Sequence, residues 1–173
     1  NATGDSIPNT NLPNQVAVLL KNGANYININ GSDLNSVQLF NTLNNANADQ
    51  FLIVNVNAPG VFNWNVWAQN GIANQDASHI IYNFYNTTQL HLQGNNSIYG
   101  SILAPFASIT KNENSADVVG QIIATSYTQS GGIVHCETFS SEVNAPIAVN
   151  VAPMAAFTAN DNECLANNTF VFN

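Results

Sequence analysis

An internal repeat constrains this chain more than any other feature of its sequence. Residues 98–104 (IYGSILA) align with residues 118–124 (VVGQIIA), 20 positions further along. If both segments are strands, alternate positions point the same small or branched residues to one side. Stacked coils of a β-solenoid need such copies, because each coil buries its inward row only against its neighbours. The repeat therefore predicts a β-solenoid in which Gly100 and Gly120 stack where backbones approach closely.

Two similar neighbouring strands of a β-sandwich are the alternative explanation of this repeat. The rest of the chain is also β-rich, since residues 26–30 (YININ), 52–56 (LIVNV) and 62–66 (FNWNV) alternate between apolar residues and Asn. Asn-Gly turns between such runs predict hairpins or corners. A near-helical spacing predicts at most one short helix, at Leu34, Val37, Phe40 and Leu43. The expected fold class is all-β.

Charge excludes two classes of partner. Only 7% of the residues are charged, the net charge is −8, and the basic residues are Lys21 and Lys111 alone. Such a chain has nothing to neutralise a row of phosphates, so nucleic acid and anionic lipid are poor partners. No stretch approaches the roughly 20 consecutive apolar residues of a membrane-spanning helix, so we expect no membrane insertion. The amide-rich composition indicates a secreted, extracellular protein.

A change in the sequence pattern near Glu142 predicts a domain boundary. Residues 144–153 (NAPIAVNVAP) are extended and punctuated by proline, as interdomain linkers are. We therefore expect a β-solenoid domain over residues 1–143, a linker over 144–153 and a second domain that begins at 154.

Several short motifs carry a family resemblance. They are residues 80–84 (IIYNF), 89–94 (QLHLQG), 100–105 (GSILAP) and 120–124 (GQIIA), with 131–135 (GGIVH) and Phe139 as a closing pattern. Together they resemble the choice-of-anchor A domain of bacterial surface proteins. The resemblance implies an adhesive domain held at the cell surface, without catalytic residues, whose N-terminal part precedes residue 1.

The last twenty residues resemble the start of another family. Residues 152–160 (APMAAFTAN) and 169–173 (TFVFN) look like the first two strands of a PKD-type immunoglobulin-like sandwich. Such domains are spacers in large surface proteins. Cys136 and Cys164 lack the CxxC spacing of zinc or redox sites, and a disulfide between them stays open. The resemblance implies instead that the partner of Cys164 follows Asn173, which leaves Cys136 free or paired within its own domain.

The aromatic residues are the candidates for ligand binding, because aromatic faces beside amides hold sugars. Phe62, Trp64 and Val66 share one strand face and are assigned to the core. Alternation along the neighbouring segments predicts that Trp67, Tyr82 and Tyr85 are exposed. These three are the predicted ligand-binding residues.

No residue pattern predicts a metal site or a catalytic site. His135, Cys136 and Glu137 are adjacent on a strand and point to opposite faces, so they do not share one ion. Calcium at residues 161–163 (DNE) lacks a full set of loop ligands. Glu113 and Asp117 are carboxylates of a loop, without the cleft of a glycosidase. We expect no cofactor and no enzyme activity.

Three functions compete on this reading. The leading hypothesis is a cell-surface adhesin or scaffolding module that binds glycans, matrix or cell-surface proteins. The alternative is a structural subunit of an extracellular filament or sheath, which self-associates through exposed strand edges. A carbohydrate-active β-helix enzyme comes third, because the chain has no arginine to serve as a polysaccharide-lyase base.

Overall fold

Residues 6–7, 12–112 and 116–143 are described by a computed structural model of the chain. The chain divides into two units, Asn1–Val143 and Asn144–Asn173, and every described residue belongs to the first. The expected linker at 144–153, the PKD-like strands from 154 onward, Cys164 and the calcium candidates at 161–163 lie outside the described residues.

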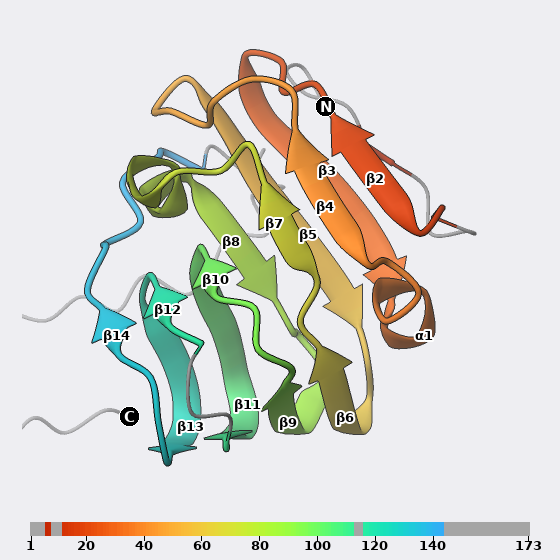
Figure 1. Cartoon of the computed structure of the whole chain (residues 1–173), viewed down its shortest axis with the longest axis vertical. Helices are drawn as coiled ribbons and strands as arrows, with labels where there is room; N and C mark the ends of the chain where they lie inside the picture. The colour runs from red at the N-terminus through yellow and green to blue at the C-terminus, as the bar shows by residue number, and fades with distance from the viewer. Residues whose placement is uncertain (1–5, 8–11, 113–115, 144–173) are drawn as a thin grey trace, which may run out of the picture. The chain divides into compact units, whose positions relative to one another are not determined.

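An eight-stranded parallel sheet forms the largest part of the described unit, with β13 paired to β11 beside the path β1-β3-β5-β8-β11-β9-β6 (Figure 1). Its strands are β1 (Ser6–Ile7), β3 (Gly23–Asn30), β5 (Gln50–Asn57), β6 (Gly60–Asn65), β8 (Ile80–Asn83), β9 (Thr87–Gln93), β11 (Ser101–Lys111) and β13 (Ile122–Gln129). The first part of β11 pairs with β8 and its last part pairs with β9. The sheet is thus bent at a corner that β11 crosses without a break.

Two three-stranded parallel sheets complete the arrangement. One contains β2 (Gln15–Val18), β4 (Leu39–Thr42) and β7 (Ala68–Asn70), and the other contains β10 (Ile98–Tyr99), β12 (Val118–Val119) and β14 (Val134–His135). The chain passes through the sheets repeatedly, and each passage is called a coil below. This curled stack of parallel strands is consistent with a β-helix-like fold.

The 20-residue repeat is confirmed by the pairing of its strands. Ile102 lies beside Ile122 and Ile98 lies beside Val118, in parallel register. A Cβ atom on Gly120 would overlap the carbonyl of Gly100, so the two glycines do lie where backbones approach closely. The predicted strands at 26–30 and 52–56 also form, and the one predicted at 62–66 forms as far as Asn65. The turns between them are corners, since the named strands all pair in parallel.

A second, longer repeat joins the earlier coils through asparagine side chains. The Nδ2 of Asn83 donates to Oδ1 of Asn55, and the Nδ2 of Asn55 donates to Oδ1 of Asn28, both at 2.9 Å. A corner ladder runs in the same way through Asn86, Asn57 and Asn30. These ladders satisfy amides that face away from the core, and they hold β3, β5 and β8 in register.

The helix prediction was largely wrong. Helix α1 spans only Gly31–Leu34, and Phe40 lies in strand β4, where its ring is fully buried and stacks on Trp67. A second short helix, the 3-10 helix η1 (Asn74–His79), was not predicted. The buried carboxylate of Asp76 accepts the Ala73 N–H at 2.6 Å and so caps its start. Neither helix of the described residues is long and apolar enough to cross a membrane.

Candidate functional site

Two of the three predicted ligand-binding aromatics are buried. Trp67 is 2% exposed and Tyr82 is 0% exposed, so the prediction that they lie at the surface is wrong. Both pack in the core around Trp64, whose ring centroid lies 6.0 Å from that of Trp67 and 5.1 Å from that of Tyr82. Tyr85 is 45% exposed, which confirms the exposure predicted for it.

The prediction of exposure failed for Tyr82 and Trp67 for a local reason. Residues Ile80 and Ile81 are both aliphatic, so alternation alone does not say which of them points inward. Asn83 joins the outward ladder, and therefore Ile80 and Tyr82 face the core. Trp67 follows the end of β6, where Val66 and Trp67 turn inward in succession.

The Tyr82 hydroxyl belongs to a short chain of hydrogen bonds inside the core. It accepts a hydrogen bond from Nε2 of Gln69, whose Oε1 accepts the Tyr99 N–H at 2.7 Å. Burial raises the pKa of Tyr82 well above its usual range. Tyr82 therefore ties two coils together inside the core and stays protonated.

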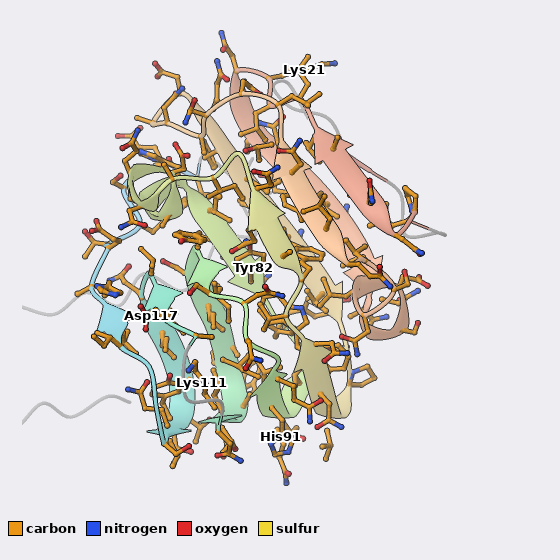
Figure 2. All side chains as sticks on the ribbon, in the orientation of Figure 1. Lys21, Tyr82, His91, Lys111 and Asp117 are labelled. Atoms are coloured by element: carbon orange, nitrogen blue, oxygen red, sulfur yellow. The ribbon has the colours of Figure 1, made fainter. Side chains whose placement is uncertain are left out.

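Outward side chains of β6, β9, the last part of β11 and β13 form a regular polar surface, called the polar face here. Its first row is Val61, Gln89, Ser108 and Ser126, its second row is Asn63, His91, Thr110 and Thr128, and its third row is Asn65 and Gln93. All are exposed except the half-buried His91 and Thr110. Figure 2 shows the His91 side chain extending away from the ribbon, whereas Tyr82 lies within it.

The spacing of the polar face follows from its strands. Neighbours along a row are about 4.8 Å apart, because they sit on adjacent strands, and consecutive rows are about 6.7 Å apart, because they are two residues apart on one strand. Apart from the apolar Val61, the side chains are hydroxyls, amides and one imidazole, which donate and accept hydrogen bonds in several directions. The polar face therefore offers many weak contacts and no pocket.

Formal charge is missing from the rows of the polar face. Lys111 ends β11 next to the second row, but its side chain points inward and is 3% exposed. Its Nζ donates to the carbonyl of Gly131 at 2.9 Å. The cation thus holds the loop before β14 and takes no part in the surface.

The corner beside the polar face carries two exposed aromatic rings. Three residues of β11 separate Ala104 from Ser108, whereas one residue of β13 separates their partners Ala124 and Ser126. The extra residues bulge outward, and Phe106 is 68% exposed. Sequence reasoning missed Phe106, although Pro105-Phe106 interrupts the alternation of its strand. We call Phe106 and Tyr85 the aromatic corner.

The last coil leaves its core side incompletely covered. A cavity of about 470 Å³ is lined there by Ile122, Ala124, Tyr127 and Val134, among others. No strand of the described residues pairs with the outer edge of β13. This edge is uncharged over its eight residues.

The loop between β13 and β14 is held by an acidic side chain. Oδ1 of Asp117 accepts the Ile133 N–H at 2.8 Å, and Oδ2 lies 3.3 Å from Nε2 of His135. Two hydrogen bonds hold the pKa of Asp117 below its ordinary value. The bond from the Ile133 N–H has the larger effect, and the bond from His135 has the next largest. Cys136 beside them is free and exposed within the described part of the chain.

The described residues gather no cluster of three metal-ligating side chains. His135, Cys136 and Glu137 are not gathered into such a cluster. Glu113, the proposed partner of Asp117 in a carboxylate pair, lies outside the described residues. Asp117 itself has the structural partners named above.

After β14 the chain leaves the last coil and runs back toward η1 (Figure 1); residues 136–143 are called the strap. The Phe139 ring packs edge-on against Phe51 with centroids 6.1 Å apart, and the Ser140 N–H donates to the Ser78 carbonyl at 2.9 Å. Nδ1 of His79 lies 2.8 Å from Oγ of Ser141. Burial lowers the pKa of His79.

Comparison with known proteins gives one family. The model of the family described as "Putative Ice-binding-like adhesive domain" matches residues 1–136. The search of curated proteins found no match, and neither did the search of solved structures. The expectation of an adhesive domain is confirmed at this level. The choice-of-anchor A assignment and the PKD-like start of a second domain stay predictions.

Proposed function

The chain belongs to this ice-binding-like adhesive domain family, and from that premise we propose that it is a non-enzymatic adhesin or scaffolding module, secreted and displayed at a cell surface. Its described unit is a β-solenoid, and it contacts glycans, matrix or other cells through the polar face. The observation that carries the proposal is the register of the polar face, which aligns uncharged donors and acceptors from four strands.

Many weak contacts suit adhesion better than catalysis. Each exposed hydrogen bond contributes about 0.5–1.5 kcal/mol at most, so strength comes from repetition across rows and across copies. Catalysis would need a group whose pKa is tuned within a cleft. On this proposal the full chain releases no new reducing ends from polysaccharides, and a reducing-end assay checks this expectation.

Adhesion through the polar face is tested by removing three exposed side chains. The variant Gln89→Ala, Ser108→Ala, Thr128→Ala keeps the inward rows and should fold. Retention of the full 173-residue chain is measured on immobilised glycans, matrix proteins, whole cells and ice. Loss of three hydrogen bonds should weaken retention at least about tenfold.

The matched control removes three exposed polar side chains elsewhere, as Gln15→Ala, Ser32→Ala, Gln38→Ala. It should bind as the unmodified chain does. Equal retention of the two triple variants would exclude the polar face as the contact surface. If the unmodified chain were retained on no surface at all, the adhesive function itself would be excluded.

A subunit of an extracellular filament is the second candidate, favoured by the open edge of β13. Edge strands of soluble proteins usually carry charge or proline that prevents pairing between molecules, and β13 has neither. The half-buried Ile122, Ala124 and Tyr127 would be covered by a further strand.

Light scattering at rising concentration tests this second candidate. The unmodified chain should associate, and Ile123→Lys on β13 should return it to a monomer by placing a charge on the edge strand. Ile133→Lys is the matched control, because Ile133 is similarly exposed but lies outside β13. A monomeric unmodified chain at every concentration would exclude assembly through this edge.

A further inference from the structure

We propose that the aromatic corner, Tyr85 and Phe106, together with the adjoining first row of the polar face, is a binding site for a neutral polysaccharide chain. The proposal rests on the adhesive function above and names its ligand class. It starts from Phe106, whose position packing does not explain.

Phe106 is exposed by the construction of β11. A phenyl ring buried in a core stabilises a fold by a few kcal/mol, but Phe106 is 68% exposed in an otherwise well-formed strand. The flanking residues Ala104 and Ala107 are fully buried, so the bulge directs Phe106 outward while its neighbours stay in the core. Bulges commonly re-aim a side chain next to a functional site.

Tyr85 lies in the matching connection of the preceding coil. The register fixes this, since Asn83 pairs with Leu103 before the corner and Gln89 pairs with Ser108 after it. The connection that contains Tyr85 therefore runs beside the one that contains Phe106. The two rings share one corner, and the first row of the polar face begins directly beyond it.

This combination fits a sugar ring. A pyranose presents C–H groups on its faces, which pack on an aromatic ring, and hydroxyls at its rim, which bind amides and hydroxyls. Gln89 and Ser108 supply such groups immediately beside the two rings. Two rings beside one row of such groups suit several consecutive sugar units better than one.

The lack of charged side chains at this site favours a neutral ligand. Neither the aromatic corner nor the rows of the polar face contain a lysine, arginine or carboxylate. Lys111, the nearest cation along β11, has its Nζ engaged with the Gly131 carbonyl in the interior. Carboxylated or sulfated polymers would lose hydration of their charges here without gaining an ion pair.

The test compares neutral polymers with carboxymethylated derivatives of two of the same backbones. Hydroxyethyl cellulose, dextran and mannan are compared with carboxymethyl cellulose and carboxymethyl dextran in affinity electrophoresis of the full chain. We expect at least one neutral polymer to retard the chain more than the carboxymethyl polymers do. Tyr85→Ala and Phe106→Ala should each weaken that retardation about tenfold, whereas Tyr85→Phe and Phe106→Tyr should preserve most of it.

The control is Leu43→Ala, which removes an exposed apolar side chain far from the corner in sequence and should change nothing. Stronger binding of carboxymethyl polymers, binding of matrix protein alone, or unchanged binding of both alanine variants would overturn the proposal. A chain that adheres to cells through the polar face but ignores every neutral polymer would refute the ligand class and leave the adhesive function standing. A chain that adheres to nothing would refute both.

Discussion

Gly120 shows how closely single residues are constrained where coils stack. Its φ is 156°, and any Cβ would overlap the Gly100 carbonyl, a backbone atom that has no freedom to move aside. Gly94 also has a positive φ, of 89°, but the nearest atom to its added Cβ is 3.7 Å away. The two glycines therefore separate the effect of steric overlap from that of φ alone.

Replacing Gly120 by alanine should destabilise the unit more than replacing Gly94. We expect Gly120→Ala to lower the free energy of unfolding by about 3 kcal/mol and Gly94→Ala by about 1 kcal/mol, since only the first combines strain with overlap. Urea unfolding followed by circular dichroism measures both. Equal losses would mean that the last coil shifts freely away from Gly100.

Asp117 should make the last loop sensitive to acid. Its pKa in the folded chain lies below the ordinary value of 3.8, chiefly through the Ile133 N–H. The ionised form is favoured in the folded state, so its stabilising effect is complete above pH 3.8 and is lost as pH falls through the lower folded value. Hydrogen exchange at the Ile133 amide should therefore lose protection in that range.

Substitution of Asp117 by asparagine separates the charge from the hydrogen bond. Asp117→Asn keeps an oxygen acceptor for the Ile133 N–H but has no carboxyl to titrate. The acid-dependent loss of protection at Ile133 should disappear in this variant, when its exchange rates are corrected for intrinsic pH dependence. The same pH profile in both proteins would assign the effect to another group.

At the scale of elements, the asparagine ladders fix the register of the strands, which the apolar core alone does not do. Inward apolar rows favour burial but are similar in every coil, whereas an amide that donates to one neighbour and accepts from another is satisfied in one register only. Asn55 holds both kinds of bond, to Asn28 and from Asn83. The ladder thereby fixes how β3, β5 and β8 align.

Asn55→Ala should cost about 1–2 kcal/mol in the free energy of unfolding, because two hydrogen bonds of a half-buried side chain are lost. Asn63→Ala is the control, since Asn63 faces outward on β6 and is exposed. We expect its effect to stay within about 0.5 kcal/mol. Thermal unfolding of the two variants side by side measures the difference, and equal midpoints would contradict a stabilising ladder.

The repeat of residues 98–104 at 118–124 was predictable because the two segments pair at a constant offset of 20 residues and carry similar inward residues. The earlier coils differ in their loops, so Asn28, Asn55 and Asn83 recur at 27 and 28 residues and escape a search for one period. Had that spacing been seen, it would have placed Tyr82 inward. The aromatic corner depends on a bulge, which no alternation rule locates.

At the scale of the whole described unit, the last coil is the weak point of a stack. A coil at the end of a repeat array has one neighbour instead of two, so it opens first. The strap alters this, because Phe139 and Ser140 connect the chain after β14 to Phe51 and Ser78 in earlier coils. The Phe139 N–H also donates to Gln121 Oε1, next to β13.

Loss of the Phe139 ring should therefore loosen a coil that it does not belong to. In Phe139→Ala we expect the amides of Ile122–Gln129 to exchange about tenfold faster, while those of Gly23–Asn30 keep their rates. Hydrogen exchange with mass spectrometry resolves the two regions. Phe106→Ala removes the same atoms from an exposed position and should leave both regions unchanged. If the strap only covers Phe51, exchange would rise around β5 and not in β13.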